Sequence, residues 1–159
     1  MEFGGARADA GGQMTSEASS SDDGGPDRAG LIFAGIAGVT AVAIGAFGAH
    51  GLEERLVEGG MDTEKVARRL AQFDTGARYH LAHAVALLAM AGFRPPKPSR
   101  LWRVAGILII AGIVLFSGSL YLLVLTDTPR LGAITPIGGV AWLAAWTMIA
   151  ITGWHRRSP

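Results

Sequence analysis

The chain has 159 residues, half of them apolar, with 14 basic and 13 acidic residues and a net charge of +1. This length allows one domain and leaves no room for a separate soluble catalytic module. The absence of cysteine excludes disulfides, cysteine-based metal sites and a thiol nucleophile. The mean hydropathy is clearly positive at +0.34, and the charges are segregated: none occurs in 104–125 or in 131–154.

The first thirty residues differ in composition from the rest of the chain. They consist mainly of Gly, Ser, Ala and Asp, with almost no large apolar side chain. Such a segment buries too little apolar surface to offset the entropy lost on ordering. We therefore predict a disordered polar tail over 1–30, followed by a four-span membrane domain over 31–157.

Four apolar stretches follow, roughly Leu31–Ala49, Tyr79–Phe93, Leu101–Leu125 and Thr135–Trp154. A hydrocarbon core about 30 Å thick needs about 20 helical residues to cross. The second stretch is short, and it either extends backwards through Phe73–Arg78 or is buried by its neighbours. We predict spans over about 31–49, 76–93, 103–125 and 135–154. The first stretch also resembles a signal peptide preceded by Arg28, but it is long and glycine-rich for a signal-peptide h-region, which favours a retained span.

The connection over 51–78 contains an amphipathic pattern. Asp62 or Thr63 is a suitable N-cap, and apolar residues then recur at three- and four-residue spacing, at Val66, Leu70, Phe73 and Ala77. Such a helix either lies on the outer membrane surface before turning into the second span or caps the bundle through protein contacts. The predicted fold is all-α: an integral membrane four-helix bundle with an amphipathic interfacial helix between spans one and two.

Small and hydroxyl residues within the spans predict close helix packing, because helix association in lipid depends on close approach and interhelical hydrogen bonds. Thr135 followed by Pro136 is also a typical helix start, with a hydroxyl cap before a proline that needs no N–H partner. The candidate packing positions are Gly45, Gly48, Ser117, Gly118, Ser119, Pro136, Gly138 and Gly139.

Three histidines and a tyrosine form a candidate polar or ligand-binding cluster at the predicted outer end of spans one and two: His50, Tyr79, His80 and His83. Three imidazoles would suit zinc or haem. Histidine inside a membrane protein more commonly faces the bundle and bonds to hydroxyls or carbonyls, and Ser117 and Tyr121 of the third span are partners of that kind. We favour the structural network over a ligand or proton site, and expect no metal and no cofactor.

The distribution of basic residues predicts the orientation. The short 94–103 loop carries four basic residues and no acid, whereas the long 50–78 segment mixes basic residues with acids. The positive-inside rule therefore places both termini in the cytoplasm, in a multi-pass protein of the cell (inner) membrane.

Four sequence motifs in order resemble a known family: Gly45-Ala46-Phe47-Gly48-Ala49-His50, Tyr79-His80-x-x-His83-Ala84, Leu115-Phe116-Ser117-Gly118-Ser119-Leu120-Tyr121 and Ile134-Thr135-Pro136-Ile137-Gly138-Gly139. They are similar to the small membrane proteins of the YgdD type and their eukaryotic transmembrane-protein-256-like relatives. The resemblance covers about Leu31 to Trp154. It implies a four-helix integral membrane protein and carries over no activity, because the family is a domain of unknown function. The polar tail and the longer 51–78 segment depart from the compact family pattern.

Two classes of function remain open. The first is a small structural or interaction component, surrounded by the lipid bilayer and assembled as a homo-oligomer or within a larger membrane complex. The alternative is a transporter or channel for a small solute or protons that uses the histidine cluster, although the spans lack the Asp, Glu or Lys typical of proton relays. We do not expect an enzyme, because neither Ser117 nor Ser119 has a histidine in its own motif. No nucleic-acid partner is expected.

Overall fold

The structure is a computed structural model that describes residues 27–155, so most of the predicted tail lies outside the described residues. All regular elements within this range are helical, which confirms the all-α fold. They are α1 (Arg28–His50), α2 (Leu52–Glu58), α3 (Thr63–Gly92), α4 (Arg100–Gly112), the π-helical segment η1 (Ile113–Gly118), α5 (Ser119–Thr126), the 3-10 segment η2 (Pro129–Ala133) and α6 (Thr135–His155).

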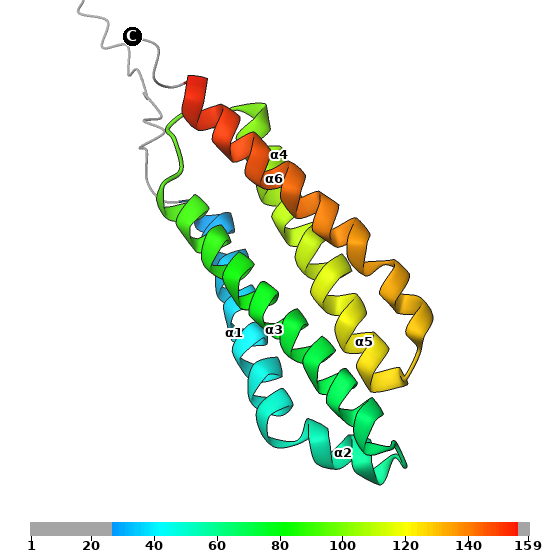
Figure 1. Cartoon of the computed structure of the whole chain (residues 1–159). Helices are drawn as coiled ribbons and strands as arrows, with labels where there is room; N and C mark the ends of the chain where they lie inside the picture. Colours follow the sequence, from blue (N-terminus) through cyan, green and yellow to red (C-terminus); the bar gives the residue numbers. More distant parts are fainter. Residues whose placement is uncertain (1–26, 156–159) are drawn as a thin grey trace, which may run out of the picture.

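The long helices form two pairs that meet through α3. Helix α1 packs along α3, and α4 packs along α6. The segments α4, η1 and α5 follow one another as a single rod, and α3 also contacts η1 and α5. Figure 1 shows α2 at one end of this four-rod bundle, while α1 begins and α6 ends at the opposite end. Both ends of the described chain therefore lie on the same side.

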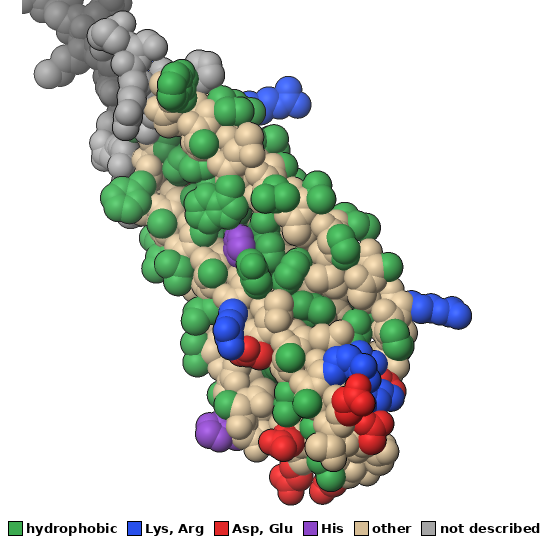
Figure 2. All heavy atoms as spheres, in the orientation of Figure 1, with side chains coloured by type: hydrophobic (Ala, Val, Ile, Leu, Met, Phe, Trp, Pro, Cys, Tyr) green, Lys and Arg blue, Asp and Glu red, His purple; other side chains and the backbone are tan. Residues whose placement is uncertain are grey.

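Three segments of the described residues are long and apolar enough to cross a membrane: Arg28–His50, Arg100–Thr126 and Pro129–Trp154. The fourth rod, α3, carries charged side chains in its first half and is apolar in its second half. On the face drawn in Figure 2, most acidic and basic side chains gather toward the α2 end, and much of the rest is hydrophobic. A four-helix membrane protein is consistent with this distribution.

The amphipathic stretch after Asp62 differs from its expected geometry. The Asp62 side chain caps the helix by accepting a 2.8 Å hydrogen bond from the Lys65 backbone N–H. From Thr63, however, α3 runs unbroken to Gly92 and does not lie separately on the membrane surface. The stripe that includes Val66 and Phe73 buries against α2 and α5, and it continues in phase into the second span. Thirty residues rise about 45 Å, so the helix extends beyond a 30 Å hydrocarbon core.

Close packing occurs at some of the predicted glycines and not at others. A Cβ on Gly138 would collide with the backbone of Phe116, and one on Gly48 would meet the Phe73 ring. Gly139 lies beside Phe116 as well, with 3.8 Å from its Cβ position to the ring. Gly48 and Gly138 therefore sit where helices approach closely, whereas Gly139 is in ordinary van der Waals contact.

The expectation for Gly45 is wrong, because no heavy atom lies within 4 Å of its Cβ position. Helix α1 packs lengthwise on α3 alone, and its contact stripe uses Ala34, Ala41 and Gly48 at seven-residue spacing. Gly45 lies beside that stripe and is half-buried, but its Cβ position faces open space. Other candidates also lie outside tight contacts: a Cβ on Gly118 would meet only the Ile113 carbonyl at 4.0 Å, and Pro136 is exposed.

Candidate polar site

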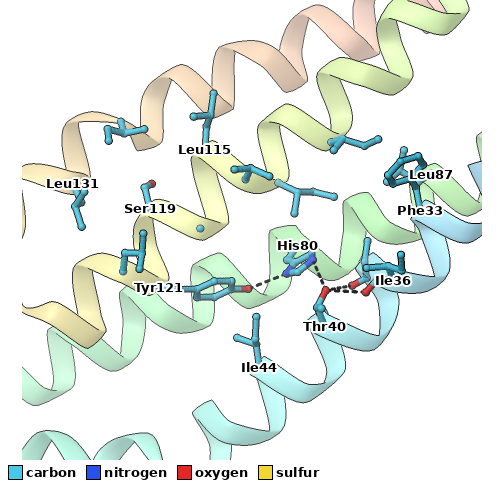
Figure 3. Close-up of a pocket in the computed structure, with 17 residues that line it drawn as sticks. Phe33, Ile36, Thr40, Ile44, His80, Leu87, Leu115, Ser119, Tyr121 and Leu131 are labelled. Atoms are coloured by element: carbon cyan, nitrogen blue, oxygen red, sulfur yellow. Dashed lines mark hydrogen bonds between the residues drawn. The ribbon is translucent and has the colours of Figure 1, made fainter.

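His80 lies in the middle of the bundle, in a chain of hydrogen bonds that joins three helices (Figure 3). Its Nδ1 is 3.3 Å from the Tyr121 hydroxyl, and its Nε2 is 3.4 Å from Thr40 Oγ1. Thr40 donates its own proton to the Ile36 carbonyl at 2.9 Å, because a carbonyl oxygen only accepts. Thr40 must then accept from His80 Nε2–H, which in a neutral imidazole leaves Nδ1 to accept from the Tyr121 hydroxyl. This set of bonds is complete with a neutral imidazole.

His83 is held by a different set of partners. Its Nδ1–H donates to the Tyr79 carbonyl at 2.8 Å, and its Nε2 accepts from the Trp146 indole N–H at 3.3 Å. The ring lies against Trp142, with centroids 3.7 Å apart. A carbonyl oxygen can only accept a hydrogen bond and an indole N–H can only donate one. One ring nitrogen of His83 therefore carries a proton and the other does not, so the imidazole is neutral. Neither ring nitrogen has a lone pair left for a metal ion.

Hydroxyl groups of the third span complete the polar interior. Ser119 Oγ lies 3.0 Å from the Phe116 carbonyl and 2.8 Å from Thr135 Oγ1, which links the start of α5 to the start of α6. Ser117 is fully buried within η1, and its Oγ faces the Tyr121 hydroxyl without reaching hydrogen-bond geometry. The π-helical turn of η1 thus carries a buried hydroxyl beside the His80 chain.

His50 does not join the other two histidines. It is exposed at the end of α1, and ten residues, or about 15 Å of helix rise, separate it from Thr40 at the level of His80. His80 therefore lies near mid-bundle and not at the outer end, because α3 begins well before Tyr79. Within the described residues, no group of three His, Asp or Glu side chains could hold a metal ion. The three-imidazole arrangement is not formed.

Three important partners were not found by sequence reasoning. Trp142 and Trp146 lie one turn apart on α6. In an apolar stretch, two aromatic residues at this spacing indicate ordinary apolar packing and not a hydrogen-bonding role. Thr40 had a detectable signal, since it is the only hydroxyl side chain in the first apolar stretch. Tyr79 contributes its carbonyl to His83, while its half-exposed ring stacks against Trp142, with 5.6 Å between the ring centroids.

A charged clamp lies outside the membrane-spanning segments, at the α2 end. The Asp127 carboxylate forms ion pairs with Lys65 and Arg69, each at 2.6 Å, and these pairs connect α3 to the end of α5. Arg69 is buried, and Asp127 adopts a left-handed backbone with φ of 49°. Hydrogen bonds from Lys65 and then Arg69 lower the pKa of Asp127.

The helices, the apolar exterior and the internally bonded polar groups define a small multi-pass helical membrane protein. Residues 44–139 match the family model described as "Protein of unknown function (DUF423)", and the chain belongs to this family. It is 45% identical to the UPF0382 membrane protein YwdK of Bacillus subtilis, over 76% of this chain and 92% of that protein. It is 36% identical to the UPF0382 inner membrane protein YgdD of Escherichia coli, over 76% and 86% respectively. No solved structure matches the chain.

Proposed function

We propose that this protein works as a small structural or interaction component of the cell (inner) membrane and not as a transporter. The observation that carries the proposal is the bonding of its two interior histidines. His83 has both ring nitrogens committed, and His80 bridges Tyr121 and Thr40. A proton relay needs groups that exchange protons along a path, whereas these bonds favour neutral, fixed rings.

The proposed orientation places both termini in the cytoplasm. The end of the bundle where α1 begins and α6 ends carries five basic side chains in its described part, at Arg28, Arg94, Lys97, Arg100 and Arg103. Asp27 is the one acidic residue there among the described residues. The opposite end mixes acids and bases around α2. The positive-inside rule supports the proposed orientation.

Interaction with other chains is proposed through the outer faces of the bundle. Val39 on α1 and Leu143 on α6 are 71% and 70% exposed, and each belongs to an apolar helix face. These faces meet lipid or another chain. Association by homo-oligomerisation or within a larger complex would use close van der Waals packing at one of them.

Two measurements test this function. Purified protein in vesicles that enclose a pH-sensitive dye should pass no more protons than empty vesicles under a pH gradient. The chain lacks cysteine, so single cysteines at Val39 and Leu143 report contacts between copies by disulfide formation in the membrane. We expect cross-linked dimers from one of these positions. Proton flux that disappears in His80→Gln would instead establish the transport alternative.

A further inference from the structure

A groove of about 640 Å³ opens on one face of the bundle between α1 and the α4–α5 rod. Both of these walls pack against α3, which forms the floor. The lining is almost wholly apolar, and its polar exceptions include His80, Thr40 and Tyr121 (Figure 3). Since these three groups bond to one another, the groove presents mainly hydrocarbon to whatever occupies it.

A second hollow of about 290 Å³ continues the groove toward the end of the bundle where α1 begins. The two share Phe33, Leu87 and Ile110. The far end of the second hollow is different in character, because Arg94, Arg103 and Trp102 line it. An apolar channel therefore ends in a basic, aromatic rim.

The charge at this rim is not neutralised within the described residues. Arg94 has a long ion pair to Asp27 at 3.9 Å, with about a third of each side chain exposed. Arg103 has no ion pair among the residues the structure describes. Two guanidinium groups thus face one carboxylate. Guanidinium groups bind phosphate in a bidentate manner, and tryptophan rings settle at the level of lipid headgroups.

The depth of the groove fits one lipid leaflet. Ten residues separate Gly30, at the rim, from Thr40, beside His80, which corresponds to a rise of about 15 Å. Half of a 30 Å hydrocarbon core is about the same length. An acyl chain that enters past Phe33 would end near His80 and Thr40.

We propose that this groove binds one anionic phospholipid, with its phosphate at Arg94 and Arg103 and an acyl chain along Phe33, Leu87 and Ile110. The lipid belongs to the leaflet at the α3–α4 end, which the proposed orientation makes the cytoplasmic leaflet. Binding would fill the space between α1 and the α4–α5 rod and hold the two helix pairs together. Lipid retention does not depend on proton flux or on self-association, so it is tested separately from the proposed function.

The first test uses the charge at the rim. Protein in micelles that contain equal amounts of phosphatidylglycerol and phosphatidylcholine is examined by native mass spectrometry. The wild type should retain one phosphatidylglycerol in preference to phosphatidylcholine. Changing both Arg94→Gln and Arg103→Gln should weaken that retention about tenfold or more. The matched control, Lys97→Gln with Arg100→Gln, removes the same charge from residues that line neither hollow.

The second test blocks the path of the acyl chain. A Cβ on Gly106 meets only the end of Met90, at 3.8 Å, so Gly106→Leu should fill the hollow without disturbing the backbone. We expect Gly106→Leu to lose the lipid and to keep the wild-type melting temperature in lipid-free detergent. Gly35→Leu, which lines neither hollow and has open space around its Cβ position, should keep the lipid. The proposal would be overturned if the two double variants at the basic residues lost the lipid equally, or if the wild type retained the two lipids equally. It would also be overturned if a second copy of the chain bound in place of lipid, or if Gly106→Leu retained the lipid fully.

Discussion

The imidazole of His83 lies flat against the indole of Trp142, with ring centroids 3.7 Å apart and ring planes 5° apart. The same imidazole accepts a hydrogen bond from Trp146, one turn further along α6. Trp142 in turn donates its N–H to the Ile109 carbonyl of α4. One histidine of the second span is therefore connected to the fourth span directly and to the third through Trp142, and we infer that it helps to hold the two helix pairs in register.

Replacing His83 by Leu should lower the free energy of unfolding by about 1–2 kcal/mol, because the Trp146 N–H would lose its acceptor in an apolar environment. His83→Gln should cost less, since an amide can still donate and accept. Titration with a denaturing detergent, followed by tryptophan fluorescence, measures both. His50→Leu is the control and should have no effect, because His50 is exposed. A similar loss at His50 and His83 would contradict this role.

Asp127 should make stability depend on acid pH. Lys65 and Arg69 hold its folded-state pKa below the ordinary value of 3.8. The stabilisation is therefore present above that ordinary value and is lost as pH falls through the lower, folded-state pKa. Asp127→Asn should melt at a lower temperature than the wild type at neutral pH. The difference between the two melting temperatures should become smaller in strong acid. Asparagine tolerates the left-handed backbone at this position, so the substitution tests charge and not strain.

The matched control is Asp74→Asn, which breaks the exposed ion pair to Arg78 four residues along α3. Exposed pairs of this kind contribute little, so this variant should melt close to the wild-type temperature at neutral pH. The opposite result would be a difference in melting temperature between the wild type and Asp127→Asn that stays constant from neutral to strongly acidic pH. That result would show that the carboxylate charge does not stabilise the clamp.

Two glycines should respond in opposite ways to added bulk. Gly138→Ala places a methyl group against the Phe116 backbone, which we expect to cost about 1–3 kcal/mol of stability through overpacking. Gly45→Leu adds a larger side chain but should be nearly neutral, because its Cβ position has open space around it. The fraction of protein that stays folded after stepwise heating ranks the two variants. If Gly45→Leu were the more damaging variant, that face of α1 would have to pack against a neighbour and not face open space.

Topology can be tested with reporter fusions. Fusions after Arg157 and within 95–99 should report a cytoplasmic location, and fusions near Gly60 or Thr128 an external one, because the dense basic loop over 94–103 favours the cytoplasm. Insertion at Gly60 is suitable since it lies in an exposed turn with positive φ. An external report from the C-terminal fusion, with the loop fusion still cytoplasmic, would mean that the helices do not alternate across the membrane as the bundle requires.

Sequence alone was sufficient for the features that depend on local pattern. Asp62, one of the two predicted N-caps, caps α3, and α6 begins at Thr135, one residue before the predicted first helical residue Pro136. The all-helical class also follows from the apolar stretches, since a backbone in lipid must satisfy its own hydrogen bonds. These properties require only the hydropathy and the capping chemistry of neighbouring residues.

The tertiary structure decided which residues meet across helices. Trp146 and His83 are 63 positions apart, and Arg69 and Asp127 are 58 apart. Whether α1 presents Gly48 or Gly45 to its neighbour depends on how the helix is rotated about its axis. A glycine-rich helix has little amphipathic contrast, so its periodicity does not specify that rotation. Pairings between distant positions and helix rotations arise from the packing of all four rods together, and this is why only the folded structure revealed them.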